Sequence, residues 1–414
     1  MVSGNNTLNG GAGNDSLSAD SSAGDNLLDG GNDNDYLSVS GSYYDPEVSG
    51  NNTLNGGAGN DSLSAFYSTG DNFLDGGDDN DYLNVNLANG NNTLNGGVGD
   101  DSLSANISRG TNLLSGGDGN DSLSACDFEG YRFDNTSGNN TLNGDAGDDY
   151  LNANYSRGAN LLNGGDGNDT LTASNYGYGY GGRCYTCTGN NTLNGGAGAD
   201  NLNVDYSSGD NLLSGDDGND TLTASGYEYD EQGESGKGVY RTASGNNTLN
   251  GGAGADNLIV DYSTGTNLLD GGDGNDTLSA YSALGNNTLY GGFGNDIITG
   301  GNGNDTLYGG DGTDTFVFNS YNQGIDSLYD FNATNELIQV SVAGFGGELA
   351  TASLKPSQFT IGTSATTSAQ RFIYDNITGG LFFDQDGSAS GFTQVKFAQL
   401  SAGVTLTENN FLVV

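Results

Sequence analysis

Leucine recurs along the chain at intervals of nine and then eleven residues. Around the second leucine of each pair, apolar and polar residues alternate, as in the segment Ser62-Leu63-Ser64-Ala65. Alternation with a period of two is typical of a half-buried strand. We therefore expect the leucines, and the Ala or Val two residues after the second one, to form a narrow core. A representative series is Leu54, Leu63, Leu74, Leu83, Leu94 and Leu103, with Ala65, Val85 and Ala105.

The leucine pairs belong to a repeat of about 20 residues, a length typical of solenoids. About twelve units run from Gly4 to Gly285, and two kinds alternate. Odd units read GNNTLNGGAGNDSLSA, whereas even units begin Gly-x-Asn-Leu-Leu. Two strands and two turns per unit would make one coil, and coils would stack about 4.8 Å apart. The predicted fold is all-β: a right-handed parallel β-roll over residues 1–318, with a C-terminal β cap domain over residues 319–414.

Composition by itself would indicate a disordered chain. Only 33% of the residues are hydrophobic and the formal net charge is −44, a combination common in disorder. Proline, however, occurs only twice, and the leucine spacing is strict. Repeat architecture explains both observations, because each coil needs to bury only a few apolar side chains against its neighbours.

The first turn of each unit predicts a calcium site. It reads Gly-Gly-x-Gly-x-Asp-x-Leu, as in Gly56 to Leu63. Glycine permits the positive φ that turns carbonyl groups toward one point, and aspartate supplies a hard anionic oxygen. Stacked turns would share each ion, which gives about a dozen Ca²⁺ ions on one edge. Beyond Asn287 three such turns follow at nine-residue spacing, so both edges are expected to bind calcium there. The predicted ligands are Asp15, Asp35, Asp61, Asp81, Asp101, Asp121, Asp149, Asp169, Asp200, Asp220, Asp256, Asp276, Asp296, Asp305 and Asp314.

The second turn of each unit has asparagine at the corresponding place. Stacked amides can hydrogen-bond to one another along a ladder, whereas stacked carboxylates would repel without a cation. We therefore predict one metallated edge and one metal-free amide edge. The asparagines are Asn6, Asn26, Asn52, Asn72, Asn92, Asn112, Asn140, Asn160, Asn191, Asn211, Asn247, Asn267 and Asn287.

Four even units carry insertions on the asparagine edge. Insertions on one edge of a solenoid suggest an interaction face, and exposed tyrosine is frequent at interfaces. Tolerated surface loops are the alternative interpretation. The insertions include Tyr43–Val48, Asp127–Thr136, Asn175–Thr186 and Tyr227–Thr242. The tyrosines are Tyr176, Tyr178, Tyr180, Tyr185, Tyr227, Tyr229 and Tyr240, and the basic residues of this edge are Arg109, Arg132, Arg157, Arg183, Lys237 and Arg241.

The three cysteines, Cys126, Cys184 and Cys187, lie in or beside these insertions. A redox CxxC motif would need a βαβ context that the pattern lacks, and a zinc site would need a fourth ligand. A disulfide among the insertions is the expected use, with its pairing left open. A further motif, Asp384-Gln385-Asp386-Gly387, reads either as a cation site or as an ordinary turn.

Charge and composition exclude several classes of function. With 53 acidic residues against 9 basic ones, the chain lacks the basic surface that nucleic-acid binding requires. It has no apolar run of 18 residues, so we expect no membrane insertion. It contains no histidine, and its Asp and Ser residues belong to the repeat, so we expect no enzyme. Because the repeats begin at Gly4, we also expect neither a signal peptide nor a separate catalytic domain.

The repeats resemble those of RTX, or hemolysin-type calcium-binding, proteins over roughly residues 4–318. The tail is similar to the C-terminal domain of that family through Asp330-Phe331-Asn332, Ile373-Tyr374-Asp375, Leu381-Phe382-Phe383-Asp384 and Asn410-Phe411-Leu412-Val413-Val414. The resemblance implies an extracellular bacterial protein, exported by type I secretion with an uncleaved C-terminal signal. It also implies a chain that folds on meeting calcium outside the cell.

Two functions are consistent with this reading. The preferred one is a structural protein that assembles head to tail into a filament, sheath or surface layer. An uncapped first coil would leave an open β-edge for the next subunit, and a contact of this kind that does not close gives a filament. The alternative is a monomeric adhesin that binds glycans or a cell surface through the tyrosine-rich insertions.

Overall fold

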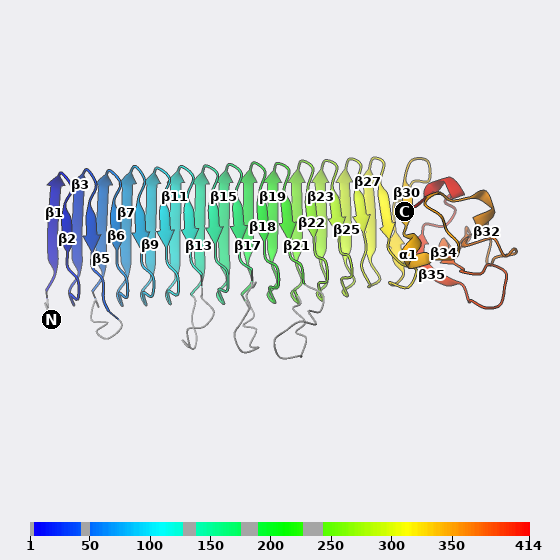
Figure 1. Ribbon diagram of the computed structural model, residues 1–414, viewed down its shortest axis with the longest axis horizontal. Helices are drawn as coiled ribbons and strands as arrows, with labels where there is room; N and C mark the ends of the chain where they lie inside the picture. The colour runs from blue at the N-terminus through cyan, green and yellow to red at the C-terminus, as the bar shows by residue number, and fades with distance from the viewer. Residues whose placement is uncertain (1–3, 43–49, 127–137, 175–188, 227–242) are drawn as a thin grey trace. The chain divides into compact units, whose positions relative to one another are not determined.

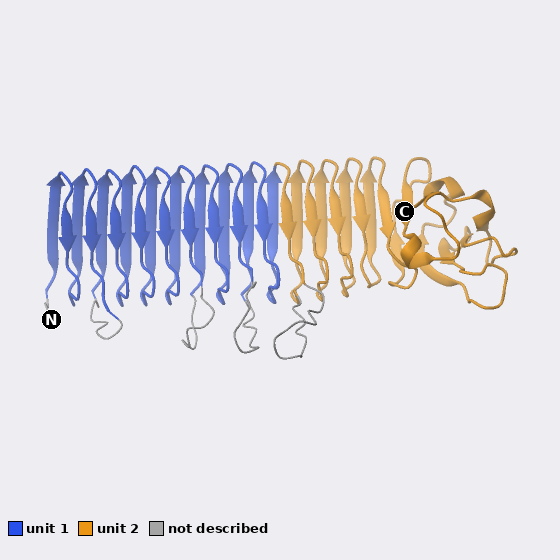
Figure 2. Cartoon of the chain, viewed as in Figure 1, with its two compact units in different colours: residues 1–217 blue, residues 218–414 orange. Residues whose placement is uncertain are grey.

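A computed structural model describes residues 4–42, 50–126, 138–174, 189–226 and 243–414. The chain divides into two compact units, Met1–Asp217 and Gly218–Val414 (Figure 2). Strands dominate both units, and no helix in the described part is long and apolar enough to span a membrane.

Each coil of unit 1 contributes one long strand and, except for the last, one short strand, as Figure 1 shows. The long strands are β1 (Asn6–Ala12), β3 (Asn26–Asn32), β5 (Asn52–Ala58), β7 (Asn72–Asp78), β9 (Asn92–Val98), β11 (Asn112–Asp118), β13 (Asn140–Ala146), β15 (Asn160–Asp166), β17 (Thr192–Ala197) and β19 (Leu212–Asp217). The short strands are β2 (Ser16–Ser18), β4 (Tyr36–Ser38), β6 (Ser62–Ser64), β8 (Tyr82–Asn84), β10 (Ser102–Ser104), β12 (Ser122–Ser124), β14 (Tyr150–Asn152), β16 (Thr170–Thr172) and β18 (Asn201–Asn203).

Strands of the same kind pair in parallel from coil to coil, so equivalent residues lie in register. Leu54 of β5 is opposite Leu74 of β7, and Leu63 of β6 is opposite Leu83 of β8. All four leucines are fully buried, as is Ala65. The predicted leucine core and the parallel β-roll are thus confirmed.

The long strands extend further than the pattern suggested. The glycine pair, expected in the turn, lies inside the strand: Gly57 of β5 pairs with Gly77 of β7. Gly57 has φ 113°, and a Cβ there would lie 2.1 Å from the carbonyl oxygen of Gly31 in the preceding coil. Glycine therefore allows the coils to stack at strand spacing with a positive φ at the residue that precedes the turn. Asp145, with φ 77°, is an exception at this position.

Unit 2 continues the same construction. Its long strands are β21 (Thr248–Ala253), β23 (Leu268–Asp273), β25 (Thr288–Phe293) and β27 (Thr306–Asp311). Its short strands are β20 (Thr221–Thr223), β22 (Asn257–Ile259), β24 (Thr277–Ser279), β26 (Ile297–Thr299) and β28 (Thr315–Phe318). Both sheets continue past Phe318, because β29 (Asp326–Leu328) pairs with β27 in parallel and β30 (Leu337–Val340) pairs with β28. The domain boundary at residues 318/319 stays a prediction.

The last part of unit 2 surrounds an aromatic core. Strands β33 (Phe372–Asp375), β34 (Gly380–Phe383) and β35 (Val395–Leu400) form an antiparallel sheet, and β35 joins β29. Phe345, Phe372, Phe383 and Phe397 are buried together, with ring centroids 5.1–6.1 Å apart. The remaining elements are α1 (Val342–Phe345), β31 (Ala352–Ser353), the 3₁₀ helix Pro356–Gln358, β32 (Phe359–Ile361), the 3₁₀ helix Glu408–Asn410 and β36 (Phe411–Val413).

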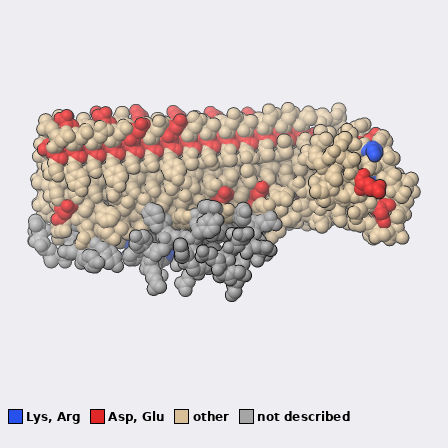
Figure 3. All heavy atoms as spheres, viewed as in Figure 1, with Lys and Arg blue, Asp and Glu red and all other residues tan. Residues whose placement is uncertain are grey.

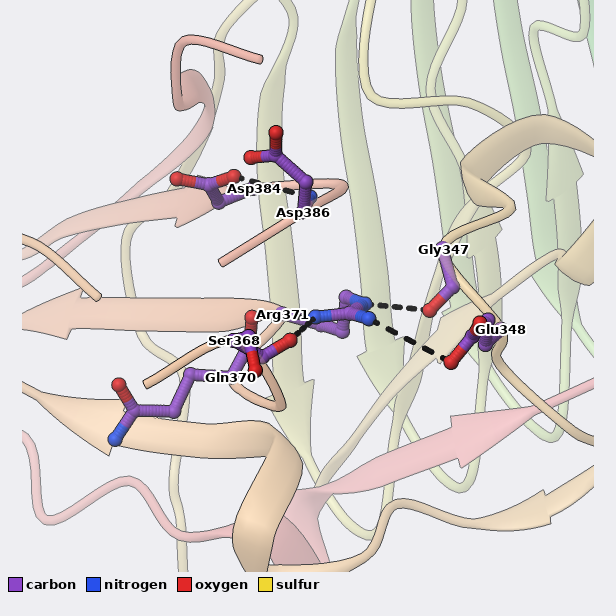
Figure 4. Close-up of polar contacts among 7 residues, drawn as sticks. All are labelled: Gly347, Glu348, Ser368, Gln370, Arg371, Asp384 and Asp386. Atoms are coloured by element: carbon purple, nitrogen blue, oxygen red, sulfur yellow. Dashed lines mark hydrogen bonds and ion pairs between the residues drawn. The ribbon is translucent and has the colours of Figure 1, made fainter. Parts of the chain in front are cut away.

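A buried arginine ties the loops of this region together (Figure 4). The Arg371 guanidinium donates hydrogen bonds to the backbone carbonyls of Gly347, Ser368 and Gln370. Its remaining charge partner is the exposed carboxylate of Glu348, 3.9 Å away. Because three carbonyls satisfy the buried guanidinium, Arg371 serves here as a structural crosslink between loops.

Candidate metal centre

A row of buried aspartates follows the turn between the long and the short strand of each coil. We call this side of the roll the Asp edge. Figure 3 shows acidic side chains in a line along it. From Asp35 to Asp314 the ladder aspartates are at most 4% exposed. None of the nine basic residues of the chain lies in these turns, so no side-chain cation is built in to balance the carboxylates.

One oxygen of each carboxylate is used to join neighbouring coils. The Asp81 backbone N–H donates to Asp101 Oδ1 at 2.7 Å, and the Asp101 N–H donates to Asp121 Oδ1 at 2.7 Å. The same bond recurs from Asp15 to Asp200 in unit 1 and from Asp220 to Asp314 in unit 2, at 2.7–2.9 Å. The carboxylates therefore keep one orientation throughout each unit.

The other oxygen is buried and accepts no hydrogen bond from any described residue. This holds for the Oδ2 atoms of Asp15, Asp35, Asp61, Asp81, Asp101, Asp121, Asp149, Asp169, Asp256, Asp276, Asp296 and Asp314. A buried anionic oxygen that accepts no hydrogen bond is costly, so such a series favours a site for a positive ligand. The unused oxygens therefore provide a direct test of whether a cation fits.

The space beside each Oδ2 atom is lined with further oxygen and kept open by glycine. A Cβ built on Gly96 would lie 2.3 Å from Asp101 Oδ2 and 2.5 Å from the Gly116 carbonyl oxygen of the next coil. Carboxylate and carbonyl oxygens are the ligands that Ca²⁺ prefers. No three His, Cys, Asp or Glu side chains converge within the described ranges, so a cation here would need backbone carbonyl oxygens among its ligands as well. The residues present thus fit calcium held between stacked turns.

The electrostatics of the Asp edge favour a cation. Burial raises the pKa of Asp81 to about 8 and the pKa of Asp101 to about 7, although each carboxylate accepts a backbone N–H. The neighbouring ladder carboxylates raise these pKa values further. A divalent cation between the turns would stabilise the ionised carboxylates and relieve the repulsion along the row.

Asp305 lies apart from the other predicted ligands. Its Oδ1 accepts the backbone N–H of Asn287 at 2.7 Å and the Asn287 side-chain amide at 3.1 Å. Its Oδ2 accepts the backbone N–H of Gly301 at 2.6 Å. Asp305 therefore ends the asparagine series of unit 2 with a carboxylate whose oxygens both accept hydrogen bonds. Which of the fifteen predicted aspartates bind calcium stays a prediction.

Asp326 is a buried acid that the repeat pattern did not identify. It is 5% exposed, and its Oδ1 accepts the Asp305 backbone N–H at 3.0 Å. Burial, with Asp305 nearby, holds the pKa of Asp326 well above its usual range. The segment Gly324-Ile325-Asp326-Ser327-Leu328 does keep the Gly-x-Asp-x-Leu spacing of the repeats. This spacing could have identified Asp326 from the sequence. It is hard to recognise because the glycine pair that precedes the aspartate in the other repeats is absent here.

The opposite side of the roll, which we call the Asn edge, carries the predicted amide ladder. Asn72 Nδ2 donates to Asn92 Oδ1 at 2.7 Å, and Asn92 Nδ2 donates to Asn112 Oδ1 at 2.8 Å. The ladder prediction is confirmed by these bonds and by those that start at Asn6, Asn26, Asn52, Asn112, Asn140, Asn160, Asn191, Asn247 and Asn267. That this edge binds no metal remains a prediction.

The insertions and two of the cysteines, Cys184 and Cys187, lie outside the described residues, so the predicted interaction face and the disulfide stay predictions. The Cys126 thiol is buried and donates to Asn152 Oδ1 at 2.9 Å. In the Asp384-Gln385-Asp386-Gly387 motif, Asp384 Oδ1 accepts the Asp386 N–H at 3.2 Å. Asp386 Oδ2 accepts the backbone N–H groups of Gly391 and Phe392. Asp386 Oδ1 is buried and accepts no hydrogen bond from a described residue, so the cation site and the ordinary turn both stay predictions.

Replacing one ladder carboxylate should lower the calcium capacity. In D101N the amide oxygen can still accept the Asp81 N–H, but the charge at the oxygen-lined space is lost. We expect about one or two fewer bound ions per chain, because stacked turns share each ion. Equilibrium dialysis with radioactive calcium measures the number. D100N, at the exposed neighbouring residue, is the control and should bind as much calcium as the parent. Equal losses in the two variants would contradict the assignment of the buried ladder.

Comparison with known families agrees with this geometry. The model of the RTX calcium-binding nonapeptide repeat (4 copies) matches residues 19–41, 48–66, 68–89, 88–123, 134–155, 156–175, 188–205, 206–226, 232–261, 262–283 and 281–316. A comparison with curated proteins finds no significant match. Proteins with these repeats bind calcium and are typically secreted, and the β-roll is a structural calcium-binding fold rather than an enzyme fold. The matched segments cover more than half of the sequence, and with the stacked glycine–aspartate turns they place the chain in the RTX calcium-binding repeat family.

Proposed function

We propose that this protein is a secreted structural protein that folds on binding calcium and assembles head to tail into an extracellular filament, sheath or surface layer. The calcium-binding repeats support its folding outside the cell, where calcium is abundant. Type I secretion, with the signal in the last residues, is part of the proposal. The proposed assembly rests on the exposed core and the unpaired strand edges of the first described coil.

The first described coil has a core that the other described residues cover only in part. Leu8 and Leu17 are partly exposed, whereas Leu28 and Leu37 of the next coil are completely buried. Within the described residues, β1 pairs only with β3 and β2 only with β4. Asp15 Oδ1 accepts no N–H there, although the equivalent oxygen of every later ladder aspartate in unit 1 does. This surface would accept another β-element that brings N–H donors and apolar side chains.

Strand β32 of unit 2 is the element that we propose for this contact. Strand β32 pairs only with β33 among the described strands, so its other edge is unpaired. Its Ile361 side chain is 55% exposed. An edge strand of this kind can add to the first coil of a second copy. The contact would be heterologous and would repeat along one direction.

Electron microscopy of the purified chain tests the assembly. In millimolar calcium we expect regular filaments or sheets, and chelation should disperse them because the coils unfold. L17K places a charge on the uncovered core of the first coil and should abolish the filaments. S16K, on the exposed side of the same strand, is the matched control and should leave them intact. Discrete particles in calcium would contradict assembly and favour the monomeric adhesin with tyrosine-rich insertions.

A further inference from the structure

The outer face of the long strands in unit 1 carries a regular apolar stripe. The residue just before the inward-facing leucine of each long strand points outward, as in β7, β11 and β15, where its neighbours on each side are buried. Large side chains on even coils alternate there with threonine on odd coils. The large residues are Leu27, Phe73, Leu113, Leu161 and Leu212, which are 36–45% exposed. The threonines are Thr7, Thr53, Thr93, Thr141 and Thr192.

The two outward positions that follow this apolar stripe along each strand carry little charge. The next outward position holds Asn or Ser on most coils, and the one after it is mostly glycine. At these three outward positions the charged residues are Asp29, Asp75, Asp145 and Asp216. The Asp29 carboxylate accepts the Asn9 and Asn55 side-chain amides at 2.8 and 2.9 Å. Four more exposed aspartates, Asp78, Asp118, Asp166 and Asp217, end these strands, so the apolar stripe is uncharged whereas the far end of the face is acidic.

We propose that the apolar stripe is a lateral packing surface for a second copy of this chain. The inference deepens the proposed function, on which it rests, by giving the filament a side-by-side contact. Large residues recur at every second coil, about 9.6 Å apart at normal strand spacing. A second copy shifted by one coil places each large residue opposite a threonine, so that the two faces interdigitate with nearly constant volume.

The partner is identified by period and by area. A partner that fits this stripe must present contact groups at the same two-coil spacing over the same length. A second copy of the chain meets this condition because its stripe has the same period. Ten long strands of up to seven residues span about 48 Å by about 24 Å. The face is therefore roughly 1,000 Å², above the approximately 800 Å² per partner of a standard stable interface.

The double variant L113K/L161K tests the stripe. Its matched control is S122K/T170K, which places the same charges on the short strands of the same two coils. Electron microscopy in calcium should show sheets or bundled filaments for the parent and the control, and filaments one subunit wide for L113K/L161K. Circular dichroism checks that all three chains keep their β structure. Unchanged bundle width in L113K/L161K would overturn the lateral contact and leave the proposed filament standing.

A second arm separates the lateral contact from end-to-end assembly. In the L17K background, which should form no filaments, sedimentation velocity in calcium should still show dimers. Adding L113K/L161K to L17K should give monomers. If the parent formed dimers but no filaments, the filament would be refuted and the lateral contact supported. A monomeric parent that binds polysaccharide through this face would overturn the inference.

Discussion

Chelation of calcium at pH 8 is expected to convert the ordered β-roll into an expanded chain. Each coil buries only about three apolar side chains, such as Leu54, Leu63 and Ala65, while it also buries a carboxylate. Without calcium, the ionised ladder would repel itself in a low-dielectric environment. Far-UV circular dichroism should lose its β signal. Small-angle scattering should approach the radius of gyration of an unfolded chain of this length, about 74 Å.

Restoring calcium should reverse the transition with a steep dependence on its concentration. Every occupied turn stabilises the folded chain, and neighbouring turns share ions, so the sites should fill together. Magnesium is the control, because it is smaller and requires a more regular octahedron of ligands. Equal refolding by magnesium would contradict a calcium-specific site. Full β structure in chelator at pH 8 would contradict any structural role for the cation.

Acidification to pH 5 is expected to restore β structure to the calcium-free chain. Burial raises the pKa of Asp61 to about 6, of Asp101 to about 7 and of Asp81 to about 8. In the unfolded chain the aspartate pKa is near 3.9. Protonation of these groups thus stabilises the calcium-free fold most fully below about pH 4. This contribution is lost as the pH rises through 6 to 8. Circular dichroism between pH 4 and pH 9, in chelator, measures the transition.

The calcium-loaded chain should show the opposite dependence, because protons compete with the cation for the same oxygens. Its stability should fall on acidification. The variant D81N/D101N is the control, since neutral amides at two ladder positions need no proton. Its calcium-free form should depend less on pH than the parent. A calcium-free parent that is equally unfolded at pH 5 and pH 8 would contradict the raised pKa values.

The parallel roll could be predicted because its period is nearly constant. A fixed interval between Leu54 and Leu74 leaves one register in which both are buried, and a shift by one residue would expose them. The same interval aligns Asp81 with Asp101 and Asn72 with Asn92. The amide ladder followed from chemistry alone, because an asparagine side chain carries both a donor and an acceptor.

Other features depend on three-dimensional contacts that periodicity does not contain. The long strands run through the glycine pair because Gly57 keeps its partner Gly77 despite a positive φ. The roles of Asp305 and Asp326 depend on which N–H groups face them after the nine-residue repeats end. The loop contacts of Arg371 join segments that are far apart in sequence. No local pattern marks the contacts of Gly57, Asp305 or Arg371, and at Asp326 only the Gly-x-Asp-x-Leu spacing remains as a signal.

The stacking register has a consequence for how the length of the protein can change. Among the described residues of unit 1, each strand pairs only with the equivalent strands of adjacent coils, and odd and even coils alternate. Removal or duplication of one pair of coils, one odd and one even, would again place an odd coil beside an even coil at the junction. Each such event would alter the stack by about 9.6 Å and leave every other contact unchanged. The number of repeats therefore sets the length of the roll, and this length can change in steps of two coils while the core stays the same.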